Sequence, residues 1–250
     1  MRGLASYRFK NMRKIRILVL FFSTLLLLNT NVIGNVYVFN KSHDFIVHMN
    51  DPLHIKFRSS KKAISKLNKL IEDTNDSHDQ LVAFQIISQT TAISDADKIN
   101  WLKENAKKLS PPFLIYLATL IGDKDEKEAV QWYLVAKIRM FYDARKCTDN
   151  SAQAGIGAVS YILLPAFGKS MNLEGKPDGL FKKLIVSEIE PAIALYHSTG
   201  YTITKPYWIA YHGLNADRPD LFIPQEKWPG LEKKVISDLR EEQQQASKDL

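Results

Sequence analysis

Apolar residues recur at intervals of three and four from residue 59 onward, which is the spacing of amphipathic helices. The first stripe consists of Ala63, Leu67, Leu70 and Ile71, and the second consists of Leu81, Phe84, Ile87 and Ile93. The sequence Ser77-His78-Asp79-Gln80 is a capping-box pattern, and it predicts that the second helix begins there.

The next three helices have clear boundary signals. Ser94 opens a helix that is expected to run to Leu109, with acidic residues in its first turn, where they suit the helix dipole. The pair Ser110-Pro111 predicts the start of another helix, and Gly122 predicts its end. The stretch from Asp125 to Lys146 is apolar over a broad face, which predicts a central helix buried on two sides.

Glycine and proline interrupt the second half of the chain. Residues 150 to 173 are apolar, but they contain Pro165, which we expect to end or kink a helix. A further apolar stripe from Phe181 to Leu195 is expected to be kinked or split at Pro191 and stopped by Gly200.

The remaining segments are less periodic. Residues 201 to 225 predict a long aromatic loop, followed by a last helix from Glu226 or Leu231 into Leu239. The polar residues 241–250 are expected to be a disordered tail. Residues 35–58 contain short apolar runs, and they predict an extended arm or a short hairpin. Together the patterns predict an all-α fold with one domain over residues 59–240, either a helical bundle or a short helix-hairpin array.

The N-terminal segment has the composition of an export signal. Six basic residues and no acidic residue precede a mostly apolar run from Ile17 to Leu28. Residues 1–34 therefore predict a signal peptide, with Gly34 as the cleavage position and either Met1 or Met12 as the start. An uncleaved membrane anchor remains the alternative, although a spanning helix usually needs about 20 apolar residues. A lipoprotein is excluded, because lipidation after export needs a cysteine at the cleavage position and the only cysteine is Cys147.

The basic excess of the chain belongs to this segment. The formal net charge is +7, from 34 basic and 27 acidic residues. Without residues 1–34, 28 basic and 27 acidic residues remain, which is a net charge of +1. This balance gives no electrostatic reason to expect a nucleic-acid partner.

One local resemblance concerns the predicted central helix. The residues from Asp125 to Ala136, DEKEAVQWYLVA, combine an acidic start with alanines and a Trp-Tyr pair. With the preceding helix from Pro111 to Ile121, they resemble a Sel-type, tetratricopeptide-like repeat. The resemblance covers residues 111–136 only, and no second copy follows at the repeat spacing. It implies protein–protein interaction rather than catalysis.

The most unusual composition lies between Tyr201 and Asp220. The candidate binding residues there are Tyr207, Trp208, Tyr211, His212, Asp217 and Arg218. Aromatic loops make good interface anchors. The same aromatic residues are also typical of a loop that is pinned to a helical core, and this interpretation is the one we favour. Both interpretations remain open at this point.

Motifs for catalysis or metal binding are missing from the sequence. No H-x-x-x-H helix, G-x-S-x-G elbow or phosphate-binding glycine loop occurs, so we expect no catalytic residues, metal or cofactor. Carboxylate pairs such as Glu72-Asp73 are typical of solvated helix faces. Basic neighbours lower the pKa of a reactive thiol, but we expect Cys147 to be a structural residue at a helix end.

These observations favour an exported, non-catalytic helical protein that binds another protein. A sharper form of this hypothesis is an immunity protein that guards the cell envelope against a rival's secreted toxin. The alternative is a periplasmic hydrolase that acts on cell-wall or lipid material and uses His212 with Asp217. A membrane-anchored scaffold requires the signal to remain uncleaved.

Overall fold

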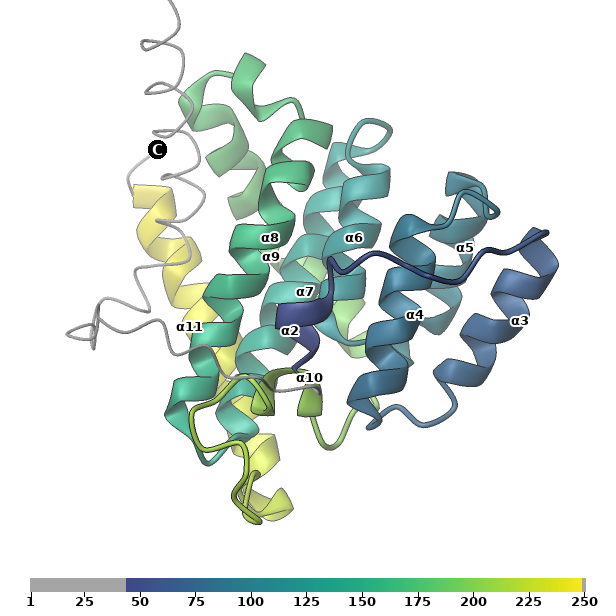
Figure 1. Ribbon diagram of the computed structural model, residues 1–250. Coiled ribbons are helices and arrows are strands. Elements are labelled where there is room, and N and C mark those ends of the chain that lie inside the picture. The colour runs from purple at the N-terminus through teal and green to yellow at the C-terminus, as the bar shows by residue number, and fades with distance from the viewer. Residues whose placement is uncertain (1–43, 249–250) are drawn as a thin grey trace, which may run out of the picture.

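The computed structural model describes residues 44–248, and it confirms the all-α prediction (Figure 1). Within these residues the only β-type pairing is an isolated bridge between Cys147 and Phe222. The helices are α2 (Phe45–His48), α3 (Ser60–Leu70), α4 (Ser77–Gln89), α5 (Asp95–Asn105), α6 (Pro111–Ile121), α7 (Glu126–Lys146), α8 (Ala154–Ser170), α9 (Asp178–Thr199), α10 (Tyr207–Ala210) and α11 (Trp228–Lys248).

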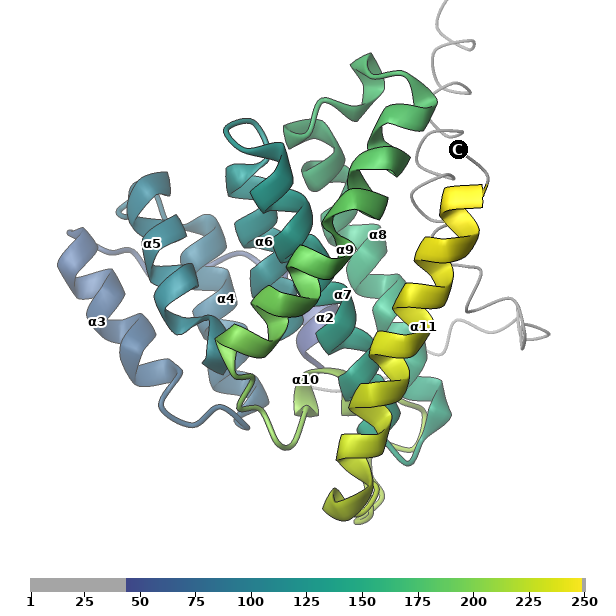
Figure 2. The ribbon, with the colours of Figure 1, turned by 180° about the vertical axis from the view of Figure 1, so that it is seen from behind.

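The helices form an array of hairpins that becomes a bundle around α7. The hairpins α3–α4 and α5–α6 stand side by side, and α3 lies at the outer edge (Figures 1 and 2). Helix α7 packs against α6, α8, α9 and α11. The view from behind shows α11 crossing the far side of the bundle (Figure 2). The fold therefore combines the two architectures that the sequence left open.

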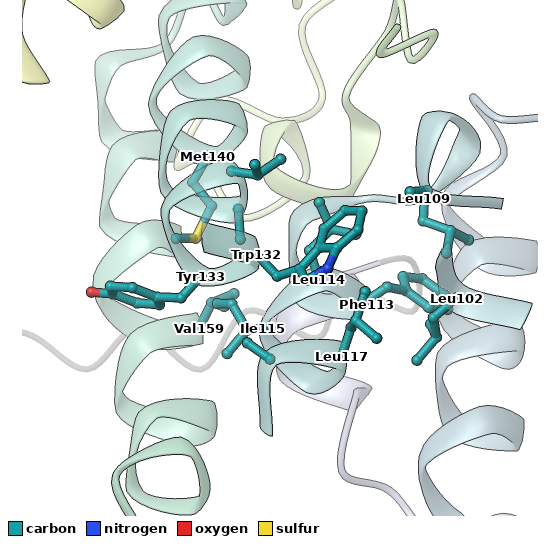
Figure 3. Close-up of a cluster of buried hydrophobic side chains, with 14 of the residues drawn as sticks. Leu102, Leu109, Phe113, Leu114, Ile115, Leu117, Trp132, Tyr133, Met140 and Val159 are labelled. Atoms are coloured by element: carbon teal, nitrogen blue, oxygen red, sulfur yellow. The ribbon is translucent and has the colours of Figure 1, made fainter. Parts of the chain in front are cut away.

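Helix α7 begins where its sequence predicts. The side chain of Asp125 accepts a hydrogen bond from the Glu128 amide at 3.0 Å and so caps the helix. Ala129 and Ala136 are fully buried, and the ring of Tyr133 stacks on Phe167 of α8. Side chains from α5, α6, α7 and α8 meet in the core (Figure 3). Each large apolar side chain buried in this way contributes about 1.5–3 kcal/mol.

Two predicted boundary signals act differently from what we expected. Asp76, one residue before the predicted capping box, caps α4 by accepting a hydrogen bond from the Asp79 amide at 2.9 Å. Ser77 is consequently the first residue inside the helix. Gly122 ends α6 in a right-handed conformation, so it is not a left-handed cap. A Cβ atom there would lie 2.3 Å from Oγ of Ser170, so glycine permits the close approach of α6 and α8.

The two internal prolines do not break their helices. Helix α8 continues through Pro165 and α9 continues through Pro191, so the predicted end or split does not occur. Both prolines are exposed. Water can therefore hydrate the carbonyl groups that each proline leaves without an amide donor. Gly200 stops α9 in the left-handed conformation, at φ 58°, as predicted.

The two ends of the domain also differ from the predicted boundaries. Residues 45–48 form a helical turn instead of an extended run, because Asp44 caps them through the amides of Ile46 and Val47. The rest of the predicted arm, residues 49–58, has no regular structure, and residues 35–43 lie outside the described residues. Helix α11 continues to Lys248, beyond the expected boundary at residue 240.

The extended C-terminal helix is held by polar contacts with the bundle. Glu242 pairs with the buried Lys137 of α7 at 2.5 Å. The side chain of Gln243 donates a hydrogen bond to the carbonyl oxygen of Val186 at 2.7 Å. A polar sequence therefore remains helical here because its side chains reach partners on α7 and α9.

Within residues 44–248, one helix, at residues 150–170, is long and apolar enough to cross a membrane. The domain buries 39% of that segment. A core helix passes the same test, so this finding does not place it in a membrane. The predicted signal at residues 1–34 lies outside the described residues, and it remains a prediction.

Candidate protein-binding cleft

A solvent-open cleft of about 580 Å³ lies between the α3–α4 loop and the segment that contains α10. Its volume is within the range of ligand pockets. One wall comes from residues 73–78 and the other from residues 205–211. The lining residues are Asp73, Asn75, Asp76, Ser77, His78, Lys205, Tyr207 and Tyr211.

Two tyrosines form the aromatic wall of the cleft. Tyr207 and Tyr211 are one helical turn apart, and their rings stack with centroids 5.1 Å apart. Phe222 packs its edge against Tyr207 from the C-terminal loop. Partial burial raises the pKa of Tyr211, as do the neighbouring Tyr207 and Asp76. The tyrosine rings are therefore held in place while remaining half-exposed.

The opposite wall is acidic. Asp73 and Asp76 are exposed, and Lys205 is the basic residue in the lining. Each carboxylate is oriented by its own backbone: Asp73 accepts a hydrogen bond from the amide of Asn75, and Asp76 accepts one from the amide of Asp79. The cleft thus offers a cationic side chain two fixed carboxylates beside an aromatic surface.

Asn75 joins the two walls. Its side-chain oxygen accepts hydrogen bonds from the amides of Thr204 and Lys205, at 3.2 and 2.8 Å, and from the hydroxyl of Thr204. These residues are about 130 positions apart in sequence. This single side chain therefore fixes the distance between the α3–α4 loop and the segment that leads into α10.

A buried charged cluster lies under the aromatic wall. Asp143 of α7 has no exposed surface, and it accepts hydrogen bonds from Nε1 of Trp208 at 2.8 Å and from the Tyr201 hydroxyl at 2.5 Å. Its other oxygen lies 3.2 Å from Nζ of Lys146, which also donates to the carbonyl oxygen of Ile203. Burial and the nearby carboxylate of Asp143 raise the pKa of Tyr201 well above its usual range. Tyr201 therefore stays protonated and remains a donor.

Arg139, one turn earlier on α7, extends this cluster. Its guanidinium group is fully buried and donates to the carbonyl oxygen of Ala106 at 2.6 Å and to the hydroxyl of Thr199 at 2.7 Å. The ring centroid of Tyr201 lies 4.3 Å from the guanidinium carbon. Burial lowers the pKa of Arg139, against the opposing influence of Tyr201 and Asp143. These contacts fix the start of the C-terminal loop on α7, and so they position the cleft.

The structure assigns the predicted aromatic residues to two different environments. Trp208 is 2% exposed and belongs to the buried cluster, so it pins the loop to the core. Tyr207 and Tyr211 line the cleft. The two interpretations of the aromatic segment therefore apply to different faces of the same helical turn.

The other predicted residues lie outside the cleft. His212 faces Asp44, with Nδ1 2.9 Å from the carboxylate, and it does not pair with Asp217. Asp217 is exposed, and Arg218 makes a bidentate pair with Asp220. The cleft thus contains two of the six candidate residues from the sequence.

Little in the sequence marks residues 73–78 as one wall of a cleft. From sequence we interpreted Glu72-Asp73 as a solvated carboxylate pair and Ser77-His78 as part of a capping box. The polar turn Asn75-Asp76 is the local signal that marks this loop. Its contact with Thr204 and Lys205 depends on tertiary folding.

Cys147 is a structural thiol, as expected. It is buried, and burial together with Asp143 and Asp149 raises the pKa of its thiol to about 12. The basic neighbour Lys146 has the opposite, weaker influence. Residues 44–248 contain no group of three or more histidine, cysteine or acidic side chains that could hold a metal ion.

Comparison of the chain with protein-family models, curated proteins and solved structures gives no match. Helices α6 and α7 pack against each other over residues 111–136, where the sequence resembles a Sel-type repeat. That resemblance therefore stays a prediction. The proposed function therefore rests on the geometry of the cleft.

Proposed function

We propose that this is an exported, non-catalytic helical protein that binds another protein through the cleft. The observation that carries this proposal is the pairing of a stacked Tyr207–Tyr211 wall with the carboxylates of Asp73 and Asp76. Tyrosine is enriched among the residues that dominate binding energy at interfaces. A fixed aromatic wall also loses little conformational entropy on binding.

The chemistry of the cleft favours a partner segment with an exposed arginine. A guanidinium group can stack on the tyrosine rings and donate to a carboxylate at the same time. The partner is therefore expected to present an arginine on a protruding loop or helix end. Because Asp73 and Asp76 are exposed, their charges contribute only modestly to the binding free energy, and this contribution falls as the salt concentration increases.

The specific role we propose is an envelope immunity protein against a secreted toxin. A predicted export signal would bring the chain to the compartment that such a toxin enters. A rigid, half-apolar cleft suits the blocking of another protein. Deletion of the gene should make the strain sensitive to a toxin encoded beside it, and full resistance of the deletion strain would exclude this role.

The binding proposal is tested by affinity capture from the envelope fraction. Tyr207→Ala/Tyr211→Ala is expected to weaken capture of the main partner by about tenfold or more, the loss typical of interface anchors. Tyr161→Ala is the matched control, because Tyr161 is an exposed tyrosine on α8 that does not line the cleft. Equal capture by all three proteins would refute the proposal.

A second pair of substitutions tests the acidic wall. Asp73→Asn/Asp76→Asn keeps the side-chain shapes, and asparagine still caps α4, so folding is preserved. Binding should weaken most at low salt and little at high salt. Unchanged binding at low salt would show that the partner is not recognised through an arginine.

A separate measurement concerns the predicted signal. Sequencing the N-terminus of this protein, recovered from the envelope fraction, decides between a cut at Gly34 and a membrane anchor.

The alternative, a periplasmic hydrolase, now depends on the His212–Asp44 pair. A carboxylate that orients a histidine is a common part of a general base. Under the binding proposal, His212→Ala leaves protection and partner capture intact. Loss of a measurable hydrolytic activity in that variant would favour the enzyme instead.

A further inference from the structure

Positive charge is concentrated on helix α3 and on the segment that leads into it. Between Pro52 and Ile71 the sequence contains no acidic residue and six basic residues: Lys56, Arg58, Lys61, Lys62, Lys66 and Lys69. The rest of residues 35–250 contains 22 basic and 27 acidic residues, which is a net charge of −5. The near-neutral total of +1 therefore combines a basic edge with an acidic remainder. Such an asymmetry attracts an anionic partner to one surface.

The basic side chains of this edge are available to a partner. All six residues are exposed, and none of them makes a side-chain ion pair with another residue of the range 44–248. Lys62, Lys66 and Lys69 are spaced by four and three residues, so they form one stripe along α3, called the α3 stripe below. The buried residues of the helix are Ala63, Leu67 and Leu70. Because α3 packs against α4 and is the outermost helix of the array, a large surface can approach it (Figures 1 and 2).

The segment before α3 adds an aliphatic side chain and no aromatic surface. Ile55, next to Lys56, is 43% exposed. The only aromatic residue between Pro52 and Ile71 is Phe57, which is half-buried and packs against the core. Surfaces that bind single-stranded nucleic acid combine basic residues with aromatic side chains on which the bases stack. An exposed aliphatic residue beside lysines instead suits the boundary between lipid headgroups and acyl chains.

The type of basic residue also favours a lipid surface. Five of the six basic residues are lysines, and Arg58 is the exception. Arginine is enriched at protein interfaces and suits the recognition of nucleic acids, whereas lysine is depleted at protein interfaces. Lysine is a flexible point charge, and a cluster of four to eight basic residues on an amphipathic helix is typical of binding to anionic lipid headgroups.

We propose that the α3 stripe, together with Ile55 and Lys56, binds the surface of a membrane that contains anionic phospholipids. The apolar side of α3 stays in the core, so the lysine ammonium groups contact the headgroups and Ile55 contacts the outer ends of the acyl chains. Carboxylates return at Glu72 and Asp73, in the loop that leads to the cleft, and the same headgroups repel them. Because α3 contributes no residue to the cleft, this proposal and the proposed function can fail separately.

Co-sedimentation of the full chain, as recovered from the cells that produce it, with lipid vesicles tests the proposal. The anionic vesicles contain phosphatidylglycerol and phosphatidylcholine in equal parts, and the reference vesicles contain phosphatidylcholine alone. Each lysine near an anionic surface changes the partition by about fivefold. Lys62→Gln/Lys66→Gln/Lys69→Gln should therefore weaken binding to the anionic vesicles by about 100-fold at low salt. Binding of the native protein should fall steeply as the salt concentration increases.

The matched control removes the same charge from other surfaces. Lys124→Gln/Lys227→Gln/Lys233→Gln replaces three exposed lysines outside α3, and this variant should bind the anionic vesicles as tightly as the native protein. Glutamine is a good helix former, so both triple variants should fold, which far-UV circular dichroism checks. Ile55→Ser should weaken binding by a similar factor at every salt concentration, because salt does not screen an apolar contact.

Three outcomes would overturn the proposal. In the first, the two triple variants bind the anionic vesicles equally well, so the α3 stripe is not the contact. In the second, the native protein binds phosphatidylcholine vesicles as tightly as anionic ones, which assigns membrane binding to the predicted anchor in residues 1–34. In the third, the native protein does not bind the vesicles but binds a DNA duplex or a polyglutamate peptide through the α3 stripe, which assigns this edge to a nucleic acid or to an acidic protein.

Discussion

Replacing Asp143 with alanine tests whether the buried charged cluster holds the C-terminal loop. The change removes the acceptor of Trp208 and Tyr201 and leaves the fully buried ammonium group of Lys146 without a carboxylate. Breaking a buried ion pair by removing one partner costs about 3–5 kcal/mol. Each orphaned buried donor adds about 1–3 kcal/mol. Relaxation of the loop offsets part of this sum, so we expect a loss of at least about 4 kcal/mol.

Urea denaturation followed by far-UV circular dichroism measures this loss. A single domain is stable by about 5–15 kcal/mol, so the midpoint should shift strongly toward lower urea. Fluorescence of the folded variant should also move to longer wavelength, because Trp208 leaves a buried site. Asp220→Ala is the control: it breaks an exposed pair with Arg218 and should leave the midpoint unchanged.

A double substitution separates the charge from the packing. Asp143→Leu/Lys146→Met removes both charges and keeps similar volumes, so it should be more stable than Asp143→Ala. If Asp143→Ala denatures at the same urea concentration as the native protein, then the cluster does not anchor the loop. If the double substitution is as unstable as Asp143→Ala, then the unpaired Lys146 charge is not the cause.

Three further predictions concern other parts of the fold. Cys147 should not react with thiol reagents at pH 8 until the protein unfolds, because burial raises its pKa to about 12, and fast labelling of the folded protein would contradict this. Burial raises the pKa of Asp44, but its hydrogen bonds to His212 and to two amides lower the pKa overall; stability from this carboxylate is therefore full at neutral pH and lost as pH falls below 3.8. In Asp44→Asn the free energy of unfolding should fall less steeply as the pH is lowered below 3.8. An unchanged dependence would show that Asp44 does not cause the loss of stability in acid. Gly122→Ala should cost about 1–3 kcal/mol by pushing against Ser170, and Ser170→Gly should restore the midpoint measured by thermal denaturation.

The existence of the helices followed from apolar periodicity, but several boundaries depended on tertiary context. Helix α7 has both an Asp125 cap and a broad apolar face, so its first and last residues could be predicted from the sequence. Pro165 predicted an end or a kink, and Pro191 a kink or a split, because proline removes a hydrogen bond. The sequence does not show that both positions face solvent, where water replaces that bond. Continuation of α11 likewise depends on Lys137, which is distant in sequence.

The candidate site was predictable only where its residues are close in sequence. Tyr207 and Tyr211 stand four positions apart, and their composition drew attention to the segment. Asp73 and Asp76 lie about 130 residues away from it, and the Asn75 contact that brings them near has no sequence signal beyond a polar turn. The predicted His212–Asp217 pairing failed for the same reason. Asp44, which lies 168 residues before His212 in sequence, is the carboxylate that folding brings to it.

The same helical turn carries both stability and the proposed recognition, and this determines how binding variants must be interpreted. Trp208 points into the core and bonds to Asp143, whereas Tyr207 and Tyr211 line the cleft on the other side of the turn. Truncating the two tyrosines leaves the Trp208 bond in place, so it should reduce binding with little loss of stability. Truncating Trp208 should reduce both together. If the tyrosine variants lose binding only in proportion to stability, then the cleft is a consequence of the fold and not a recognition surface.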